Sequence, residues 1–262
     1  MIKLLTINTW KCDGDYPLRL TALRNQLSII DADIVALQES FQTVDKNMDT
    51  AKFIGSQLGY KIISSQSRRK IRTVDGIDKD SYSNVAILSK FPIMKSQIIT
   101  LPTNSDDGGR EAIAAEIKIG KRLVNIVSLH LTHLKNAKSL RILQLQNILN
   151  HQFLYESLNP TFLCGDFNSI INDVSLSSFL KPPFSLIDTF NYRKNRDGID
   201  FTLQTSNMRV KIDHILIDTG SSKSLRVLDS CIVLHDIDPE TGVKPSDHNG
   251  VLTLFDFDNA KN

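Results

Sequence analysis

Cysteine is scarce in this chain, and so are long apolar runs. The three cysteines among 262 residues, Cys12, Cys164 and Cys231, are widely spaced and form no CxxC pair. This excludes a disulfide scaffold or a zinc ribbon and favours a reducing compartment. No apolar run approaches the roughly 18 residues of a membrane helix, so we expect no membrane span. The N-terminus lacks a charged segment followed by an apolar stretch, which predicts a cytoplasmic protein without a signal peptide.

A strong excess of one charge is missing too. With 31 basic and 29 acidic residues, the net charge is +2, so no overall basic field predicts coating of DNA or membranes. Hydrophobic residues make up 41% of the chain and charged residues 23%, a globular composition that excludes a disordered chain. No repeat and no linker-like tract interrupts it. We therefore expect one domain over residues 1–262, and a monomer, because no apolar edge or heptad indicates a partner.

Short apolar segments alternate with turns and a few helical patterns. Apolar residues at helical spacing predict helices at 18–30, 51–58, 142–153 and 173–180. Short apolar runs predict strands at 2–9, 33–38, 61–65, 84–88, 98–101, 111–119, 123–130, 161–164, 210–217, 230–234 and 251–255. Residues 66–82 are polar and charged, so we expect an exposed loop there. Strands outnumber helices, which predicts an α/β fold of two mostly antiparallel sheets packed face to face, with helices outside.

Polar side chains recur at the ends of these apolar strands. They are Asn8, Glu39, His130, Asp166, Asn168, Asp213, His214, Asp247 and His248. Each alone has an ordinary interpretation as a turn former, a helix cap or a solvated strand end. An apolar strand needs no such residue at its tip, however, and strand ends that gather in a packed sheet bring these residues into one cleft. Their joint occurrence therefore predicts a functional site.

The residue types in this group favour one kind of chemistry. Carboxylates and amide oxygens with few histidines suit Mg²⁺ or Mn²⁺, whereas zinc prefers more histidine and cysteine. Such a site leaves room for a substrate phosphate, and two histidines can donate to phosphoryl oxygens or carry protons. The sequence lacks a GxSxG elbow, a phosphate-binding GxxxxGK[ST] loop and a GxGxxG loop after a strand. Hydrolysis of a phosphate ester is the reaction that this inventory predicts.

Seven segments resemble, in order, the motifs of a known superfamily. They are TINTW, ALQES, SNVAILSKFPI, SLHLTH, CGDFNS, KIDHILI and PSDHNGV. The chain is similar over residues 3–255 to the endonuclease/exonuclease/phosphatase superfamily, which has the deoxyribonuclease-I-like fold. This resemblance implies a four-layer α/β sandwich with a metal site at one edge. The superfamily's abasic-site repair nucleases usually have tyrosine where this chain has His130, so the chain resembles the histidine type instead.

The resemblance also implies roles for single residues. Glu39 matches the main metal-binding glutamate, with Asn8 beside it, and Asp247 matches the acid close to the metal. Asp166 and Asn168 match the GDxN pair, which activates or orients the attacking water and holds the phosphate.

Four further residues complete the implied site. His248 matches a phosphate-contacting acid or base, and Asp213 matches the acid that orients it. His130 matches a donor to phosphate oxygens, and Arg110 is similar to a substrate-binding arginine of some members. Asp166 is the preferred base for the attacking water, although the sequence leaves the choice between Asp166 and His248 open. His133 and His214 are weaker candidates.

We expect a Mg²⁺-dependent phosphodiesterase that cleaves nucleic acid or nucleotides by in-line attack of water. The alternatives are a phosphatase, a lipid phosphoesterase of sphingomyelinase-like or inositol type, and a non-catalytic phosphate-binding module. A basic segment bears on the substrate: Arg68, Arg69, Lys70 and Arg72. It has two interpretations, a contact with a polyanionic backbone or, as the preferred one, a solvated loop balanced by the aspartates at positions 75, 78 and 80.

Overall fold

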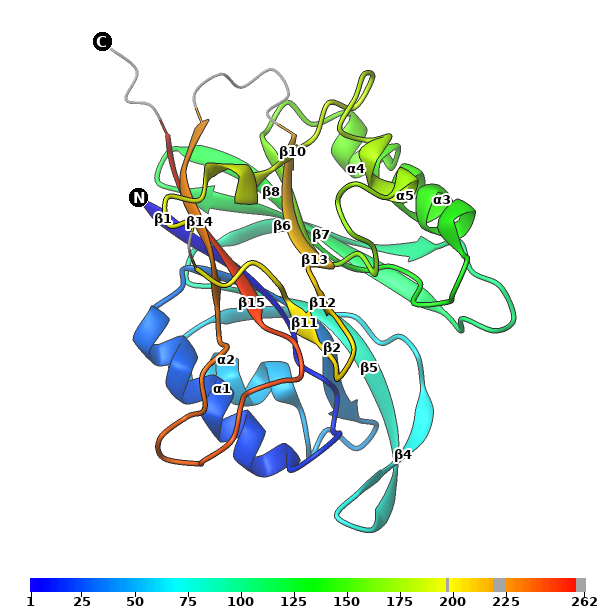
Figure 1. Ribbon diagram of the computed structural model, residues 1–262, viewed down its shortest axis with the longest axis vertical. Helices are drawn as coiled ribbons and strands as arrows, with labels where there is room; N and C mark the ends of the chain where they lie inside the picture. The colour runs from blue at the N-terminus through cyan, green and yellow to red at the C-terminus, as the bar shows by residue number, and fades with distance from the viewer. Residues whose placement is uncertain (197, 219–224, 258–262) are drawn as a thin grey trace.

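The computed structural model describes residues 1–196, 198–218 and 225–257 (Figure 1). Two mixed, mostly antiparallel sheets pack against each other, and helices lie on the outside. The predicted fold class is therefore confirmed. Among the described helices, none is both long enough and apolar enough to cross a bilayer.

The first sheet has seven strands and contains both ends of the described chain. Its order is β14 (Leu225–Val233), β15 (Gly250–Phe257), β1 (Ile2–Asn8), β2 (Ile34–Thr43), β5 (Ile77–Ser89) and β3 (Lys61–Ser64), and β4 (Lys70–Val74) also pairs with β5. β1 and β2 run parallel, and the other neighbours are antiparallel. Because they are parallel, β1 and β2 end at the same edge of the sheet.

The second sheet has six strands and, like the first, contains one pair of parallel strands. Its order is β10 (Ile187–Asp188), β13 (Asp213–Asp218), β9 (Thr161–Asp166), β8 (Arg122–His130), β7 (Arg110–Ile119) and β6 (Ile93–Leu101). β8 and β9 form its parallel pair, with His130 directly opposite Asp166 at their ends. A separate pair of short strands consists of β11 (Leu203–Gln204) and β12 (Arg209–Val210).

Helices cover the outer face of each sheet (Figure 1). The elements are α1 (Tyr16–Ile30), α2 (Thr50–Leu58), α3 (Lys138–Leu149), α4 (Gln152–Tyr155), α5 (Val174–Ser177) and the 3-10 helix η1 (Thr189–Tyr192). α1 and α2 pack on the first sheet, whereas α3, α4 and α5 pack on the second. Asp15 and Asp49 begin α1 and α2, since their side chains accept hydrogen bonds from backbone N–H groups of the first turn.

Strand alternation builds three apolar layers. In β1, Leu4 packs between the two sheets while Leu5 packs under the helices, and both are fully buried. Neighbouring strand residues point to opposite faces, so each sheet buries both of its faces. This arrangement explains why strands such as Ile34–Gln38 read as continuous apolar runs rather than as alternating ones.

The prediction of a loop over 66–82 is wrong, because residues 70–89 form the hairpin of β4 and β5. The turn is Asp75–Gly76, where both residues have positive φ (51° and 75°). An Asp-Gly pair is typical of two-residue hairpin turns, and this signal was overlooked because the flanking residues are charged. The predicted helix over 142–153 is also divided, since α3 ends before Asn150 and His151 begins α4.

Candidate active site

Strand ends from the two sheets meet in one place. Asn8, the last residue of β1, donates from Nδ2 to Oδ2 of Asp166, the last residue of β9, over 3.1 Å. Ser246, just before β15, donates from Oγ to the backbone oxygen of Asn8 over 2.6 Å. The segment that holds the predicted Asp247 and His248 is thereby fixed against β1. The expected convergence of strand ends is therefore present.

Asp213 and His248 form a buried ion pair. Nδ1 of His248 lies 2.8 Å from Oδ2 of Asp213, and the Asp213 side chain is fully buried. Burial alone would lower the pKa of His248, but the charges of Asp213 and Asp166 together with this hydrogen bond raise it to about 10. At neutral pH His248 is therefore an imidazolium ion, which donates hydrogen bonds and cannot accept a proton.

Asp166 is held from several sides. Its Oδ1 accepts from the backbone N–H of Asn168 over 2.8 Å, and its Oδ2 lies 3.6 Å from Nε2 of His130. Burial and the nearby charge of Asp213 raise the pKa of Asp166 to about 7. Near neutral pH a large share of this carboxyl group is thus ready to take up a proton, as a general base must be.

Gly165 explains why the GD dipeptide stands at the end of β9. Its φ is +153°, and a Cβ atom at this position would collide with the backbone oxygen of Leu129 in the neighbouring strand β8. Only glycine allows the two parallel strands to approach this closely. The glycine therefore brings Asp166 beside His130. Asn168 follows with φ +49°, and its Nδ2 donates to the backbone oxygen of Leu131 over 3.0 Å.

Glu39 lies within β2 rather than at its end, contrary to the prediction. The pairing of β2 with β5 is irregular between Leu37 and Ser40, and Glu39 has φ +51°. Such an irregularity redirects one side chain out of the strand alternation. The Glu39 side chain is 13% exposed and pairs with Lys11, whose Nζ lies 2.8 Å from Oε2. Lys11 was not among the predicted residues, although it follows Asn8 by three positions in the TINTWK segment.

Asp247 belongs to the same side of the site as Glu39. Burial is the main cause of its raised pKa, and the negative charge of Glu39 raises that pKa further. The two carboxylates therefore lie close enough to repel each other. A cation between two such groups would relieve this repulsion.

Arg110, the first residue of β7, binds the backbone of His130. Its Nε pairs with Asp107 over 2.7 Å, one terminal nitrogen donates to the backbone oxygen of His130 over 3.1 Å, and the other lies 2.8 Å from Nδ1 of His133. Arg110 is only 2% exposed and Asp107 is equally buried. Asp107 is thus a residue that the sequence interpretation missed, since it lies in the turn-rich segment TNSDDGG without a strand beside it.

His214 does not join the site. It is fully buried and sits between Asp188 and Lys211 on one side and the backbone oxygen of Ser169, 2.9 Å from its Nε2, on the other. Burial is the main cause of its lowered pKa. His214 is therefore part of the buried core beside the site. His133, the other weaker candidate, contacts Arg110 at the edge of the site.

The sequence matches one known protein family over most of its length. The profile of the endonuclease/exonuclease/phosphatase family matches residues 5–248, a range that includes every residue of the candidate site. The chain belongs to this family. A sequence comparison with curated proteins gives no match.

Solved structures share the fold over nearly the whole chain. An endonuclease/exonuclease/phosphatase family protein from Leptotrichia buccalis superposes with a TM-score of 0.77 at 20% identity, covering 98% of this chain and 100% of the other. Humanized TDP2 from D. rerio gives 0.77 at 18% identity, with 97% and 98% covered. D. rerio TDP2 complexed with a single strand DNA product gives 0.74 at 18% identity, again with 97% and 98% covered. At these identities the likeness shows the common fold of the family.

One buried group of this family member could hold a metal ion. Ligand atoms of Asp166, Asp213 and His248 all lie within 4.8 Å of one another. Oδ1 of Asp213 is buried and has no hydrogen-bond partner among the described residues. The other oxygen of Asp213 is hydrogen-bonded to His248, however, and this histidine is an imidazolium ion, so it would have to lose a proton before it could bind a metal ion. Glu39 and Asp247 influence each other electrostatically, and Oδ1 of Asn8 accepts from the backbone N–H of Trp10 over 3.0 Å.

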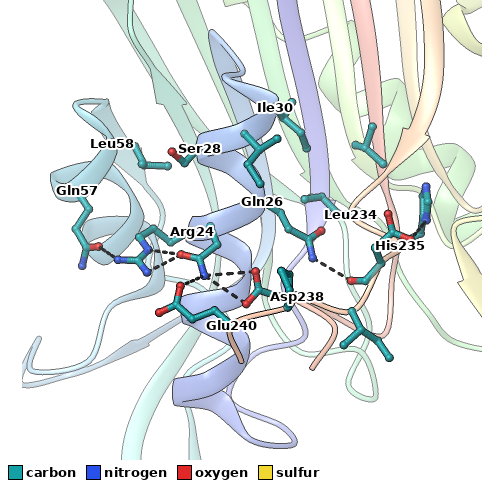
Figure 2. A pocket seen from close by; sticks show the side chains of 16 residues that line it. Arg24, Gln26, Ser28, Ile30, Gln57, Leu58, Leu234, His235, Asp238 and Glu240 are labelled. Atoms are coloured by element: carbon teal, nitrogen blue, oxygen red, sulfur yellow. Dashed lines mark hydrogen bonds and ion pairs between the residues drawn. The ribbon is translucent and has the colours of Figure 1, made fainter. Parts of the chain in front are cut away.

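A larger cavity lies away from the strand ends. It has a volume of about 880 Å³ and lies between α1, the end of α2 and the segment 233–240 (Figure 2). Its lining side chains bind one another: Arg24 donates to Gln57, and Gln26 donates to the backbone oxygen of Asp236. None of the nine predicted site residues lines this cavity. The candidate active site of this protein thus lies outside this cavity, at the strand ends.

Proposed function

We propose that the protein is a divalent-metal-dependent phosphodiesterase that cleaves nucleic acid or nucleotides by single-step, in-line attack of water. One observation carries this proposal: a buried carboxylate of raised pKa, Asp166, lies beside an imidazolium ion, His248, that Asp213 holds in its charged form. A base and a cationic donor of this kind, side by side, suit attack on a phosphate. Membership of the family and a fold shared with a TDP2–DNA product complex support the same chemistry.

The implied metal is Mg²⁺, with Mn²⁺ as a substitute. The residue types fit such a hard cation, because Glu39 and Asp247 supply carboxylates that repel each other. The amide oxygen of Asn8 accepts one hydrogen bond from the backbone of Trp10 and has a second lone pair for the cation. We therefore assign Glu39, Asp247 and Asn8 as the residues that would hold it. When bound, the cation neutralises charge on the phosphate and on the leaving oxygen.

His248 stabilises charge in this proposal. Its Nδ1 is committed to Asp213, so Nε2 remains to donate to a phosphoryl oxygen. The buried aspartate fixes the orientation of the ring and maintains its positive charge. A donor that is already oriented and charged before the reaction contributes most as negative charge builds up on the phosphate. This role differs from that of a base, because the imidazolium has no free lone pair.

Asp166 takes the proton from water in this proposal. Asn8 and Asn168 each donate one hydrogen bond to it, which fixes the carboxylate plane. His130 faces the same carboxylate from 3.6 Å. Burial and the positive charges of Arg110 and Arg68 lower the pKa of His130 well below its usual range. His130 is therefore neutral at pH 7 and can donate one hydrogen bond to a phosphate oxygen without competing as a base.

A substrate panel at fixed Mg²⁺ tests the proposal. Plasmid DNA, a single-stranded oligonucleotide, RNA, sphingomyelin, inositol phosphates and p-nitrophenyl phosphate are incubated with the wild-type protein, with and without EDTA. We expect cleavage of a nucleic acid that EDTA abolishes. The same preparation carrying Asp166→Asn controls for contaminating nucleases. Hydrolysis of a lipid or a monoester with intact nucleic acid would contradict the proposed substrate class, and EDTA-resistant turnover would contradict the metal.

A further inference from the structure

The four cations of the basic segment have different surroundings. Arg69 is exposed and pairs with Asp80, with 3.0 Å between Nε and Oδ1. Arg72 turns inward and donates to the backbone oxygens of Ser81 and Arg68 over 3.1 Å each. Lys70 is exposed. Arg68 differs from these three, because it is partly buried and its guanidinium has no partner among the described residues. Its Nε is buried without a hydrogen-bond partner, and no hydrogen bond or ion pair in the described part of the chain uses its guanidinium group.

Arg68 lines two hollows that share a wall. The larger has a volume of about 310 Å³ and is bounded on the opposite side by Gly108 and Gly109. A Cβ atom at either glycine would meet nothing within 4 Å, so this side leaves free space. The smaller hollow reaches His130 of the candidate active site. Both are lined by Ser67, Arg68, Arg110 and Glu111. Arg68 therefore stands between an open hollow and the reaction centre.

Positive charge dominates the larger hollow. It is lined by the cations Arg68, Arg69, Lys70 and Arg110 and by one carboxylate, Glu111. Burial lowers the pKa of Arg68, and the charge of Arg110 lowers it further, while Glu39 and Asp107 oppose this effect. Two guanidinium groups thus repel each other next to empty space. An anion placed there would relieve the repulsion.

Arg110 and Arg68 differ in what they can still bind. Every nitrogen of the Arg110 guanidinium already has a protein partner, namely Asp107, the backbone of His130 and the ring of His133. Arg110 is therefore a positioning residue for the two histidines. The guanidinium of Arg68 keeps its fork of donors free, and such a fork matches the oxygens of a phosphate.

We propose that Arg68 binds a second phosphate of the substrate, next to the one that is hydrolysed. It thereby selects substrates with two neighbouring phosphates, as in a nucleic-acid strand. This inference rests on the proposed function and narrows it, because a substrate with a single phosphate would leave Arg68 without a partner. It also assigns to Arg68 the substrate contact that the family resemblance implied for Arg110.

The kinetic test compares the thymidine dinucleotide TpT, with one phosphate, with the trinucleotide TpTpT, with two. For wild-type protein we expect a lower KM for TpTpT. Arg68→Gln should raise the KM for TpTpT at least about tenfold, the effect of losing a charge-assisted hydrogen bond, and leave the KM for TpT unchanged. Arg68→Lys should restore part of the difference. Arg24→Gln removes the same charge from α1, outside both hollows, and should behave as wild type.

Two outcomes of this test would overturn the assignment. An equal rise in KM for both substrates would place Arg68 at the scissile phosphate, and unchanged KM values would show that it binds no substrate. Thermal melting of Arg68→Gln verifies that the fold is intact, as expected for a side chain without partners.

Calorimetry separates this inference from the proposed function. Pyrophosphate is titrated in EDTA into wild-type protein, Arg68→Gln and Arg24→Gln, so that neither metal nor turnover contributes. Weaker binding by at least about tenfold in Arg68→Gln alone supports the second anion site. Equal binding by all three proteins overturns it. If wild-type protein cleaves neither oligonucleotide, the proposed function fails, and the calorimetric result still decides the role of Arg68.

Discussion

The two sheets contribute different halves of the candidate site. The first sheet contributes Asn8, which is buried, and Glu39, which is partly exposed and paired with Lys11. The second contributes Asp166 and Asp213, which are almost completely buried and are fixed by hydrogen bonds. An accessible carboxylate suits exchange of a metal ion with solvent, whereas burial shifts pKa values and suits proton transfer. Under the proposed function, one cleft thus separates metal binding, at its accessible carboxylate, from proton transfer, at its buried one.

Replacing the buried base should have the largest effect. Asp166→Asn keeps the size of the side chain but cannot accept a proton, so we expect kcat to fall at least about 10²–10³-fold. The exposed aspartate Asp236, changed to asparagine, is the matched control and should leave kcat unchanged. Steady-state kinetics with circular dichroism measures both. Near-normal turnover by Asp166→Asn would show that Asp166 is not the base.

Replacing the accessible carboxylate Glu39 should lower activity less, and added Mg²⁺ should restore the activity. Glu39→Gln loses a ligand, so we expect half-maximal activity at an Mg²⁺ concentration about 10–100-fold higher. Added Mg²⁺ should not rescue Asp166→Asn. Magnesium titrations of the two variants measure this difference. The reverse pattern, with rescue of Asp166→Asn only, would move the metal to the buried group of Asp166, Asp213 and His248.

The same contrast in depth decides what could be predicted from the sequence. Asn8, His130, Asp166, Asp213 and His248 follow or precede apolar strands, so their convergence is a consequence of strand periodicity and needs no knowledge of loops. The motifs of the resembled superfamily added their roles, which strand periodicity does not supply.

What escaped prediction depends on local backbone irregularity and on loops. The kink at Glu39 needs a positive φ value at a non-glycine residue, which carries a weak sequence signal. The Asp75–Gly76 turn has a typical hairpin signal, but the charged residues beside it favour a loop. Asp107 and Lys11 reach their partners from turns whose path is set by tertiary packing. Arg68 and Arg69 are adjacent and chemically identical, and only the three-dimensional structure separates the free cation from the paired one.

The pH dependence of activity tests the buried half of the site, and we expect an effect between those of the preceding two variants and that of Lys11. Because the pKa of Asp166 is raised to about 7, kcat/KM should fall about tenfold per pH unit below that value, as the base becomes protonated. It should stay level at higher pH until His248 loses its proton near pH 10. A pH–rate profile with saturating Mg²⁺ measures this. An acidic limb near pH 4 would show that Asp166 titrates as an exposed carboxylate.

Stability should change with pH in the opposite direction. The pKa of Asp166 is higher in the folded protein than the value of about 3.9 in the unfolded chain. The folded state therefore binds this proton more tightly, and the contribution of Asp166 to the free energy of unfolding is lost as pH rises through about 7. Asp166→Asn should remove this component. Denaturant unfolding of both proteins at pH 5 and pH 9 measures it, and an identical pH dependence would contradict the raised pKa.

Lys11 should give the smallest effect and the most direct test of the accessible half. Its Nζ lies 2.8 Å from Glu39 and 3.2 Å from Asp13, so it occupies the carboxylate that we assign to the metal. Burial lowers the pKa of Lys11, but the two carboxylates outweigh burial and raise it. The ammonium group is therefore a resident cation that Mg²⁺ must displace. Half-exposed ion pairs contribute about 0.2–1 kcal/mol, so Lys11→Met should lower the Mg²⁺ requirement by about 1.5–5-fold.

The matched control for this test is Lys90→Met. Lys90 pairs with Asp31, which precedes β2, and forms no hydrogen bond or ion pair with the assigned ligands among the described residues, so its loss should leave the Mg²⁺ titration unchanged. A higher Mg²⁺ requirement in Lys11→Met would mean that Lys11 orients Glu39 for the metal instead of competing with it. In that case the accessible half of the site would be as organised before metal binding as the buried half, and depth alone would not distinguish their tasks.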